Sequence, residues 1–82
     1  MQPSVLVVDD DREMREVLVD GLAARGFAVT SAGTVAEAYQ LFSSAHPDVV
    51  LADFELGDGT ALDLLAQLKA SDSNIPVVVL TG

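Results

Sequence analysis

Three short apolar runs, each followed at once by a polar residue, constrain the fold of this 82-residue chain most strongly. They are Val5–Val8 before Asp9, Val49–Ala52 before Asp53, and Val77–Leu80 before Thr81. Continuous runs rich in β-branched residues are typical of strands buried on both faces of a parallel sheet. Ligands of such sheets bind beyond the carboxyl ends of the strands. We therefore expect Asp9, Asp53 and Thr81 to gather at one edge of a sheet.

Segments with helical spacing of apolar residues separate these runs. We expect a first helix that opens with a capping box of Asp10 and Glu13, and a second that opens with Thr34 and Glu37. A further strand is expected at 27–31 and a third helix at 60–70. The predicted order is βαβαβαβ, which indicates an α/β fold with parallel strands and right-handed crossovers.

The charge of the chain excludes several classes of function. Thirteen acidic residues face four basic ones, and the net charge is −9. Such a balance argues against nucleic-acid or anionic-membrane binding by this segment, because phosphate contacts depend on Lys and Arg. The absence of cysteine excludes disulfides and thiolate metal sites. The chain has no signal-peptide pattern and no run of the ~20 apolar residues that a membrane span needs, so we expect a cytoplasmic protein.

The acidic residues after the first and third runs suit phosphoryl chemistry. Mg²⁺ prefers oxygen ligands and is often held by one or two carboxylates together with a phosphate. A carboxylate can also act as a nucleophile and form an aspartyl phosphate, and a hydroxyl such as that of Thr81 can add a hydrogen bond. An alternative for Asp10 and Asp11 is that each merely caps the following helix. We expect Arg12 and Arg15 to lie on the outer face of that helix.

Three segments together resemble the receiver domains of two-component response regulators. They are residues 5–11 (VLVVDDD), 47–53 (PDVVLAD) and 75–82 (IPVVVLTG). The resemblance implies a flavodoxin-like (CheY-like) parallel sheet of order 2-1-3-4. It also implies that residues 1–82 form a partial receiver domain that lacks the fifth strand, the last two helices and a phosphate-pairing lysine.

The same resemblance assigns roles to individual residues. Asp53 would be the phosphoacceptor and Thr81 the switch hydroxyl. Asp10 would bind Mg²⁺ directly, Asp9 through water, and Glu55 through its backbone carbonyl. The implied phosphate source is a sensor histidine kinase or a phosphotransfer domain, with an output domain for transcription in the parent protein. The resemblance thus implies a signalling domain rather than an enzyme, with at most self-catalysed phosphotransfer and dephosphorylation.

The chain departs from the family pattern in the loop after Asp53, where Gly57 replaces a usual Pro and Ala61 a usual Gly. We expect Gly57 to loosen the loop and Ala61 to be tolerated unless its φ must be positive. Without the lysine, we expect slow or absent phosphorylation by acetyl phosphate.

Two other functions stay open. Exposed apolar sheet surface would favour self-association, so the chain could be a non-catalytic self-association module. The Asp9-x-Asp11 pattern also fits an aspartate-nucleophile phosphohydrolase that attacks through Asp9.

Overall fold

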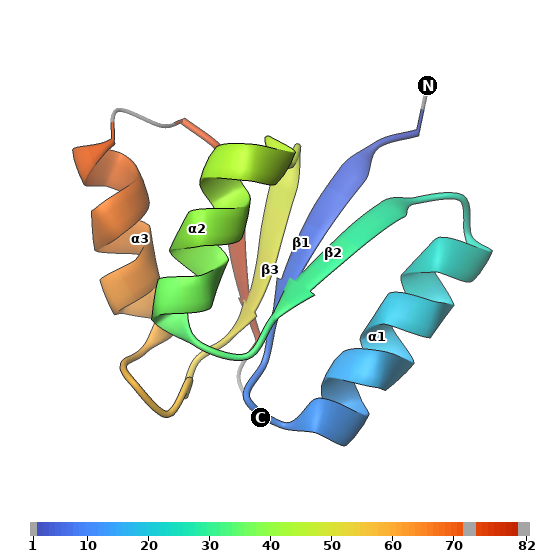
Figure 1. Ribbon diagram of the computed structural model, residues 1–82, viewed down its shortest axis with the longest axis horizontal. Coiled ribbons are helices and arrows are strands. Elements are labelled where there is room, and N and C mark those ends of the chain that lie inside the picture. Colours follow the sequence, from blue (N-terminus) through green and yellow to red (C-terminus); the bar gives the residue numbers. More distant parts are fainter. Residues whose placement is uncertain (1, 72–73, 81–82) are drawn as a thin grey trace.

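The computed structural model describes residues 2–71 and 74–80, so Thr81 lies outside the described residues. Four strands and three helices alternate along the chain (Figure 1). They are β1 (Ser4–Val8), α1 (Arg12–Ala24), β2 (Ala28–Ala32), α2 (Val35–Ala45), β3 (Val49–Asp53), α3 (Ala61–Ala70) and β4 (Val77–Leu80). All strand pairs are parallel and the order is β2-β1-β3-β4. The predicted fold is confirmed.

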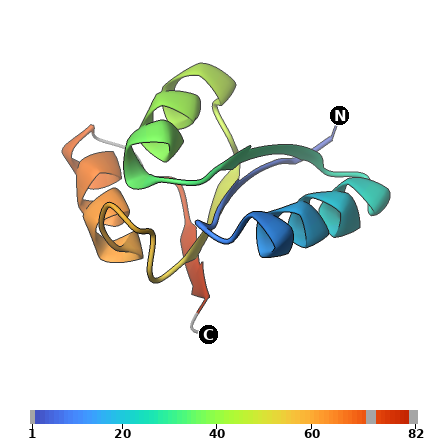
Figure 2. The same ribbon diagram turned by 60° about the horizontal axis from the view of Figure 1, so that its bottom comes forward.

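One face of the sheet carries the hydrophobic core, under α2 and α3, while α1 lies on the other face (Figure 2). Alternate residues of β1 and β3 point into this core, because side chains along a strand alternate between its faces. Leu6 and Val50 are completely buried there, and Leu56 and Leu64 join them from the following loop and from α3. The core therefore anchors the strands directly below the sheet edge at which the acidic residues follow.

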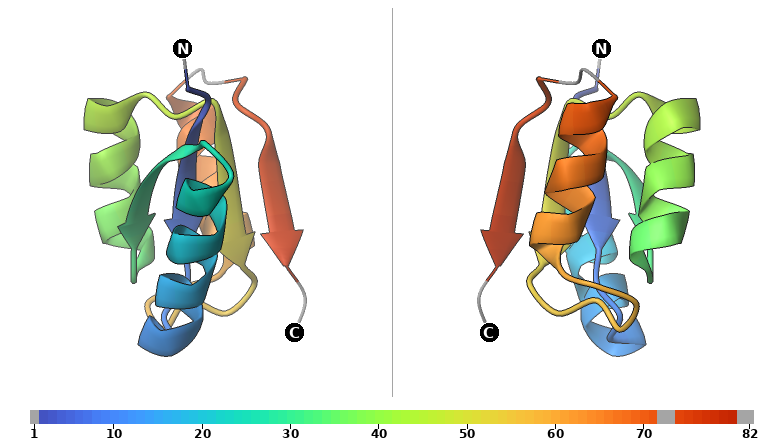
Figure 3. Two further views of the ribbon diagram at one scale, coloured as in Figure 1. Left: turned by 90° about the vertical axis from the view of Figure 1, so that its right-hand side faces the viewer. Right: turned by 90° about the vertical axis from the view of Figure 1, so that its left-hand side faces the viewer.

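The α1 face of the sheet is less well covered. None of the residues of α1 is fully buried, and Met14 and Val17 on this helix are exposed. β4 forms the outer edge of the sheet, well away from α1 (Figure 3), and its Val78 is 47% exposed. This face thus combines exposed apolar side chains from a helix and from an edge strand.

The helix starts agree only in part with the sequence-based prediction. The N-cap of α1 is Asp11, not Asp10, and its side chain accepts hydrogen bonds from the backbone N–H groups of Glu13 and Met14. The predicted capping box of Asp10 and Glu13 is therefore wrong. Thr34 does cap α2. Among the described residues, no helix is both long and apolar enough to cross a bilayer.

The predicted capping box of Thr34 and Glu37 at the start of α2 has only one of its two hydrogen bonds. Thr34 accepts from the N–H of Glu37, as expected, but the carboxylate of Glu37 accepts from the N–H of Gly33 rather than from that of Thr34. The capping box with the predicted reciprocal bond occurs at α3 instead, between Thr60 and Asp63.

Candidate functional site

Three carboxylates meet at the edge of the sheet where β1 and β3 end. Asp9 and Asp10 directly follow β1, and Asp53 is the last residue of β3. The two strands are neighbours in register, with Val8 opposite Ala52, so their carboxyl ends coincide. Each of the three residues offers a carboxylate oxygen, and these oxygens lie within 4.8 Å of one another.

Asp9 is the buried member of this acidic cluster, with only 4% of its surface exposed. Its backbone N–H donates to the carbonyl of Ala32 in β2 (3.1 Å), and its Oδ1 accepts from the backbone N–H of Asp11 (2.9 Å). Burial raises the pKa of Asp9 above its ordinary value, and the negative charges of Asp53, Asp10 and Asp11 raise it further. The hydrogen bond from Asp11 opposes these effects without cancelling them.

The donor set suits a hard divalent cation. Three carboxylates so close together repel one another, and a bound cation would offset this repulsion. All candidate ligands in the cluster are oxygens, the type that Mg²⁺ prefers. Asp10 is exposed and Asp53 partly so, which leaves room for the several waters that Mg²⁺ retains. The residues present therefore fit Mg²⁺.

The loop after β3 holds the backbone of Glu55 in place. The N–H of Ala61 donates to the carbonyl of Phe54 (2.9 Å), and the backbones of Glu55 and Thr60 form an antiparallel bridge. Leu56 is completely buried in the core. These contacts hold the Glu55 backbone at the base of the loop, although its side chain is exposed.

The two departures from the family pattern in this loop have different consequences. Gly57 has a φ of +74°, a conformation that proline cannot adopt because its ring fixes φ near −65°. Among the described residues other than glycine, only His46 has a positive φ. Ala61 therefore has no glycine-like conformation, and alanine is tolerated at this position.

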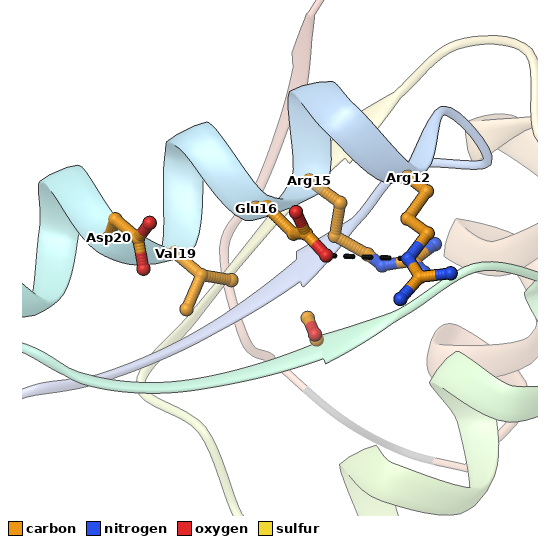
Figure 4. Close-up of a pocket in the computed structure, with 6 residues that line it drawn as sticks. Arg12, Arg15, Glu16, Val19 and Asp20 are labelled. Carbon is orange, nitrogen blue, oxygen red and sulfur yellow. Dashed lines mark hydrogen bonds and ion pairs between the residues drawn. The ribbon is translucent and has the colours of Figure 1, made fainter.

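Arg15 is placed differently from the prediction, which put it on the outer face of the first helix. It is partly buried, and its Nη1 donates to the backbone carbonyl of Asp9 (2.8 Å). Figure 4 shows it beside Arg12 at a shallow groove between α1 and β2. Arg12 stays exposed, as predicted, and pairs with Glu16 (3.3 Å). Arg15 therefore ties α1 to the backbone of the acidic cluster.

Asp11 contributes to the helix rather than to the acidic cluster. Its Oδ1 accepts from the N–H groups of Glu13 (3.0 Å) and Met14 (3.2 Å). Its backbone N–H donates to Oδ1 of Asp9, so the contact between Asp11 and Asp9 is made by the backbone of Asp11. The capping role that the sequence left open for Asp10 and Asp11 thus belongs to Asp11.

The sequence did not predict the role of Asp58 in this region. The carboxylate of Asp58 accepts from the backbone N–H of Val35 (2.8 Å) and from that of Ala36 (3.2 Å) at the start of α2. These donors, first that of Val35, hold the pKa of Asp58 below its ordinary value. No local pattern reveals this contact, because it joins residues more than twenty positions apart.

Comparisons with known proteins agree with the geometry. The sequence profile of the response regulator receiver domain matches residues 5–82. The chain is 38% identical over 80 residues to the photosynthetic apparatus regulatory protein RegA of Rhodovulum sulfidophilum, covering 98% of this chain and 44% of that protein. It is 36% identical over 79 residues to the DNA-binding transcriptional regulator NtrC of a Bradyrhizobium strain, covering 96% of this chain and 16% of that protein.

Solved structures show the same fold. The non-phosphorylated HemR receiver domain of Leptospira biflexa superposes with a TM-score of 0.89 at 31% identity, covering 98% of this chain and 64% of that one. The chain therefore spans less than half the length of these two curated relatives and slightly less than two thirds of this receiver domain.

Proposed function

Because the chain belongs to the response regulator receiver domain family, we propose that it is a phosphoacceptor module of bacterial two-component signalling. Asp53 is the acceptor in this proposal, and residues 1–82 are part of one receiver domain. The observation that carries it is the meeting of Asp9, Asp10 and Asp53, whose carboxylate oxygens lie within 4.8 Å of one another.

Asp53 acts as the nucleophile of the proposed reaction. One of its carboxylate oxygens forms a bond to phosphorus while the bond from phosphorus to the donor's imidazole nitrogen breaks. The electron pair of that bond stays on the imidazole, which takes up a proton. Phosphoryl transfer of this kind asks the protein mainly for alignment and charge neutralisation.

The neighbours of Asp53 supply this alignment and charge neutralisation. Asp9 and Asp10 would hold Mg²⁺ together with Asp53 and the backbone carbonyl of Glu55. When bound, Mg²⁺ neutralises charge on the phosphoryl oxygens. Arg15 steadies the backbone that carries Asp9, because its Nη1 donates to the Asp9 carbonyl. Thr81 is the switch hydroxyl of the proposal.

The partners follow from the same proposal. The phosphate donor is a sensor histidine kinase or a phosphotransfer domain, and the site of action is the cytoplasm. An attached output domain that controls transcription is supported by the relatives named as a transcriptional regulator and a regulatory protein. The module itself is a signalling domain, so the reaction is confined to phosphorylation and dephosphorylation of Asp53.

Self-association is a second proposed property, and the exposed apolar face supports it. Met14, Val17 and Val78 are all exposed, and β4 is an edge strand. Unprotected edges and apolar patches tend to pair with other chains.

The phosphoacceptor role is tested by chemical labelling. The wild-type protein, Asp53→Asn and Asp11→Asn are incubated with Mg²⁺ and a phosphorylated histidine phosphotransfer domain, because acetyl phosphate is expected to react slowly or not at all. The acyl phosphate is then trapped with borohydride and mapped by mass spectrometry, and a wild type that stays unlabelled contradicts the proposal. Asp11→Asn is the matched control, because Asn caps a helix as well as Asp does. Magnesium-dependent label on Asp53 in the wild type and the control supports the proposal, even at a slow rate. Label on another residue, or label that Asp53→Asn retains, contradicts it.

A further inference from the structure

The loop between β3 and α3 makes a tight turn at Gly57. The backbone N–H of Asp58 donates to the carbonyl of Leu56 (2.7 Å), two residues back, and Gly57 between them has a φ of +74°. These are the features of a γ-turn with a positive central φ, a rare and strained turn. The turn reverses the chain directly before Asp58.

Directly after this turn, the side chain of Asp58 binds the start of another helix, α2. Its Oδ1 accepts from the N–H of Val35 and its Oδ2 from that of Ala36. These N–H groups belong to the first turn of α2, where the helix leaves its backbone donors without intrahelical partners. A carboxylate at this position is stabilised by both hydrogen bonds and by the helix dipole.

The other side of the same loop faces the acidic cluster. A Cβ atom at Gly57 would lie 3.7 Å from Oδ2 of Asp10, so the turn lies close to a candidate metal ligand. A Cβ atom at Gly59 would lie 3.3 Å from Cγ2 of Val35, so the loop also packs closely on α2. The loop thus lies between the acidic cluster and the start of α2.

We propose that Asp58 is a positioning residue for the metal site, because its bonds to Val35 and Ala36 fix the loop that carries the Glu55 carbonyl. This inference rests on the proposed function. Leu56 anchors the loop in the core, and Asp58 anchors its tip. Without the second anchor, the backbone of residues 55–58 gains freedom that Mg²⁺ binding must remove.

The coupling acts in both directions, as thermodynamic linkage requires. If Asp58 favours the loop conformation that binds Mg²⁺, then bound Mg²⁺ favours the bonds of Asp58 to α2. The amides of Val35 and Ala36 should exchange with solvent more slowly when Mg²⁺ is present. The amide of Glu37 is an internal control, because it donates to Thr34 rather than to Asp58.

A purely structural role would give a different pattern. If Asp58 only stabilised α2, any weakening of the start of this helix would have the same effect on the site. Thr34→Ala removes the N-cap of α2 and leaves the loop after β3 untouched, so it is the matched control for Asp58→Ala. Asp58→Asn keeps one acceptor oxygen and should show partial rescue.

The experiment measures Mg²⁺ affinity by calorimetry and amide exchange by NMR in the full chain. We expect roughly fivefold weaker Mg²⁺ binding in Asp58→Ala, a change typical of losing a capping side chain, and wild-type affinity in Thr34→Ala. We expect Mg²⁺ to slow exchange at Val35 and Ala36 in the wild type, and this effect to vanish in Asp58→Ala.

Three outcomes separate the claims. Equal Mg²⁺ affinity of Asp58→Ala and the wild type overturns the positioning role while the proposed metal site stands. Amide exchange rates at Val35 and Ala36 of the wild type that are unchanged by bound Mg²⁺ also overturn the positioning role. This measurement does not depend on the folding of any variant. A wild-type protein that binds no Mg²⁺ overturns the proposed function and, with it, this inference.

Discussion

At the scale of single residues, Asp9 shows how the site stores unfavourable energy. It is buried beside two other acids, and burial, followed by the nearby negative charges, raises its pKa. Because the pKa of Asp9 is higher in the folded protein than in the unfolded chain, protonation of Asp9 favours the folded state. This favourable contribution is complete below the ordinary pKa of 3.8 and is lost as the pH rises through the raised pKa. Above the raised pKa, the ionised carboxylate of Asp9 destabilises the fold unless a cation is bound.

Asp9→Asn should therefore make the metal-free protein more stable at neutral pH, by an amount of the order of 1 kcal/mol. The amide keeps an oxygen that can accept from the N–H of Asp11, and it carries no charge. Urea unfolding without Mg²⁺ measures the effect, which should disappear in acid below the ordinary pKa of Asp9. A variant less stable than the wild type at neutral pH would show that repulsion in the acidic cluster is unimportant.

At the scale of elements, the sequence predicted the strands better than the contacts between loops and helices. The runs that became β1, β3 and β4 are continuous and apolar, so the sequence alone identifies them as strands. Whether Asp10 or Asp11 caps α1 depends on how the chain leaves β1, which two adjacent acids do not reveal. The bonds of Asp58 to α2 were invisible because no short-range pattern joins these segments.

The loop after β3 gives a prediction at the same scale. Gly57→Pro restores the residue usual in the family, yet it should destabilise the protein by about 2 kcal/mol, because a φ of +74° lies outside the range of proline. Gly57→Ala should destabilise the protein by about 1 kcal/mol, because a positive φ is unfavourable for a residue with a Cβ atom. The Cβ atom adds no further cost, because it would meet only ordinary contacts. Urea unfolding of the three proteins measures both changes. A more stable Gly57→Pro protein would mean that the loop takes another conformation in solution.

At the scale of the whole molecule, the two faces of the sheet differ. α2 and α3 seal one face into a core, whereas the α1 face leaves Val78 exposed on the edge strand β4. The resemblance to receiver domains predicted exposed apolar sheet surface, because the run 77–80 would form an unprotected edge strand. The sequence did not predict that α1 itself would leave Met14 and Val17 exposed, since helical spacing shows which residues share a face and not how closely that face is packed.

This asymmetry predicts concentration-dependent self-association that Val78→Lys weakens. A charge on the edge strand opposes pairing with another chain. Leu62→Lys is the matched control, because Leu62 on α3 is 57% exposed and lies away from the α1 face. Sedimentation velocity over a range of concentrations measures the change. A wild type that stays monomeric throughout, or equal effects of both lysines, would contradict the assignment of this face.

The convergence of Asp9, Asp10 and Asp53 on one cation is the claim on which the whole account depends, and a calorimetric Mg²⁺ titration tests it most directly. We predict one Mg²⁺ site in the wild type and in Asp11→Asn, with binding at least roughly tenfold weaker in Asp10→Asn and in Asp53→Asn, a loss of about 1.4 kcal/mol or more. Equal affinity in all four proteins, or no binding by the wild type, would contradict the account.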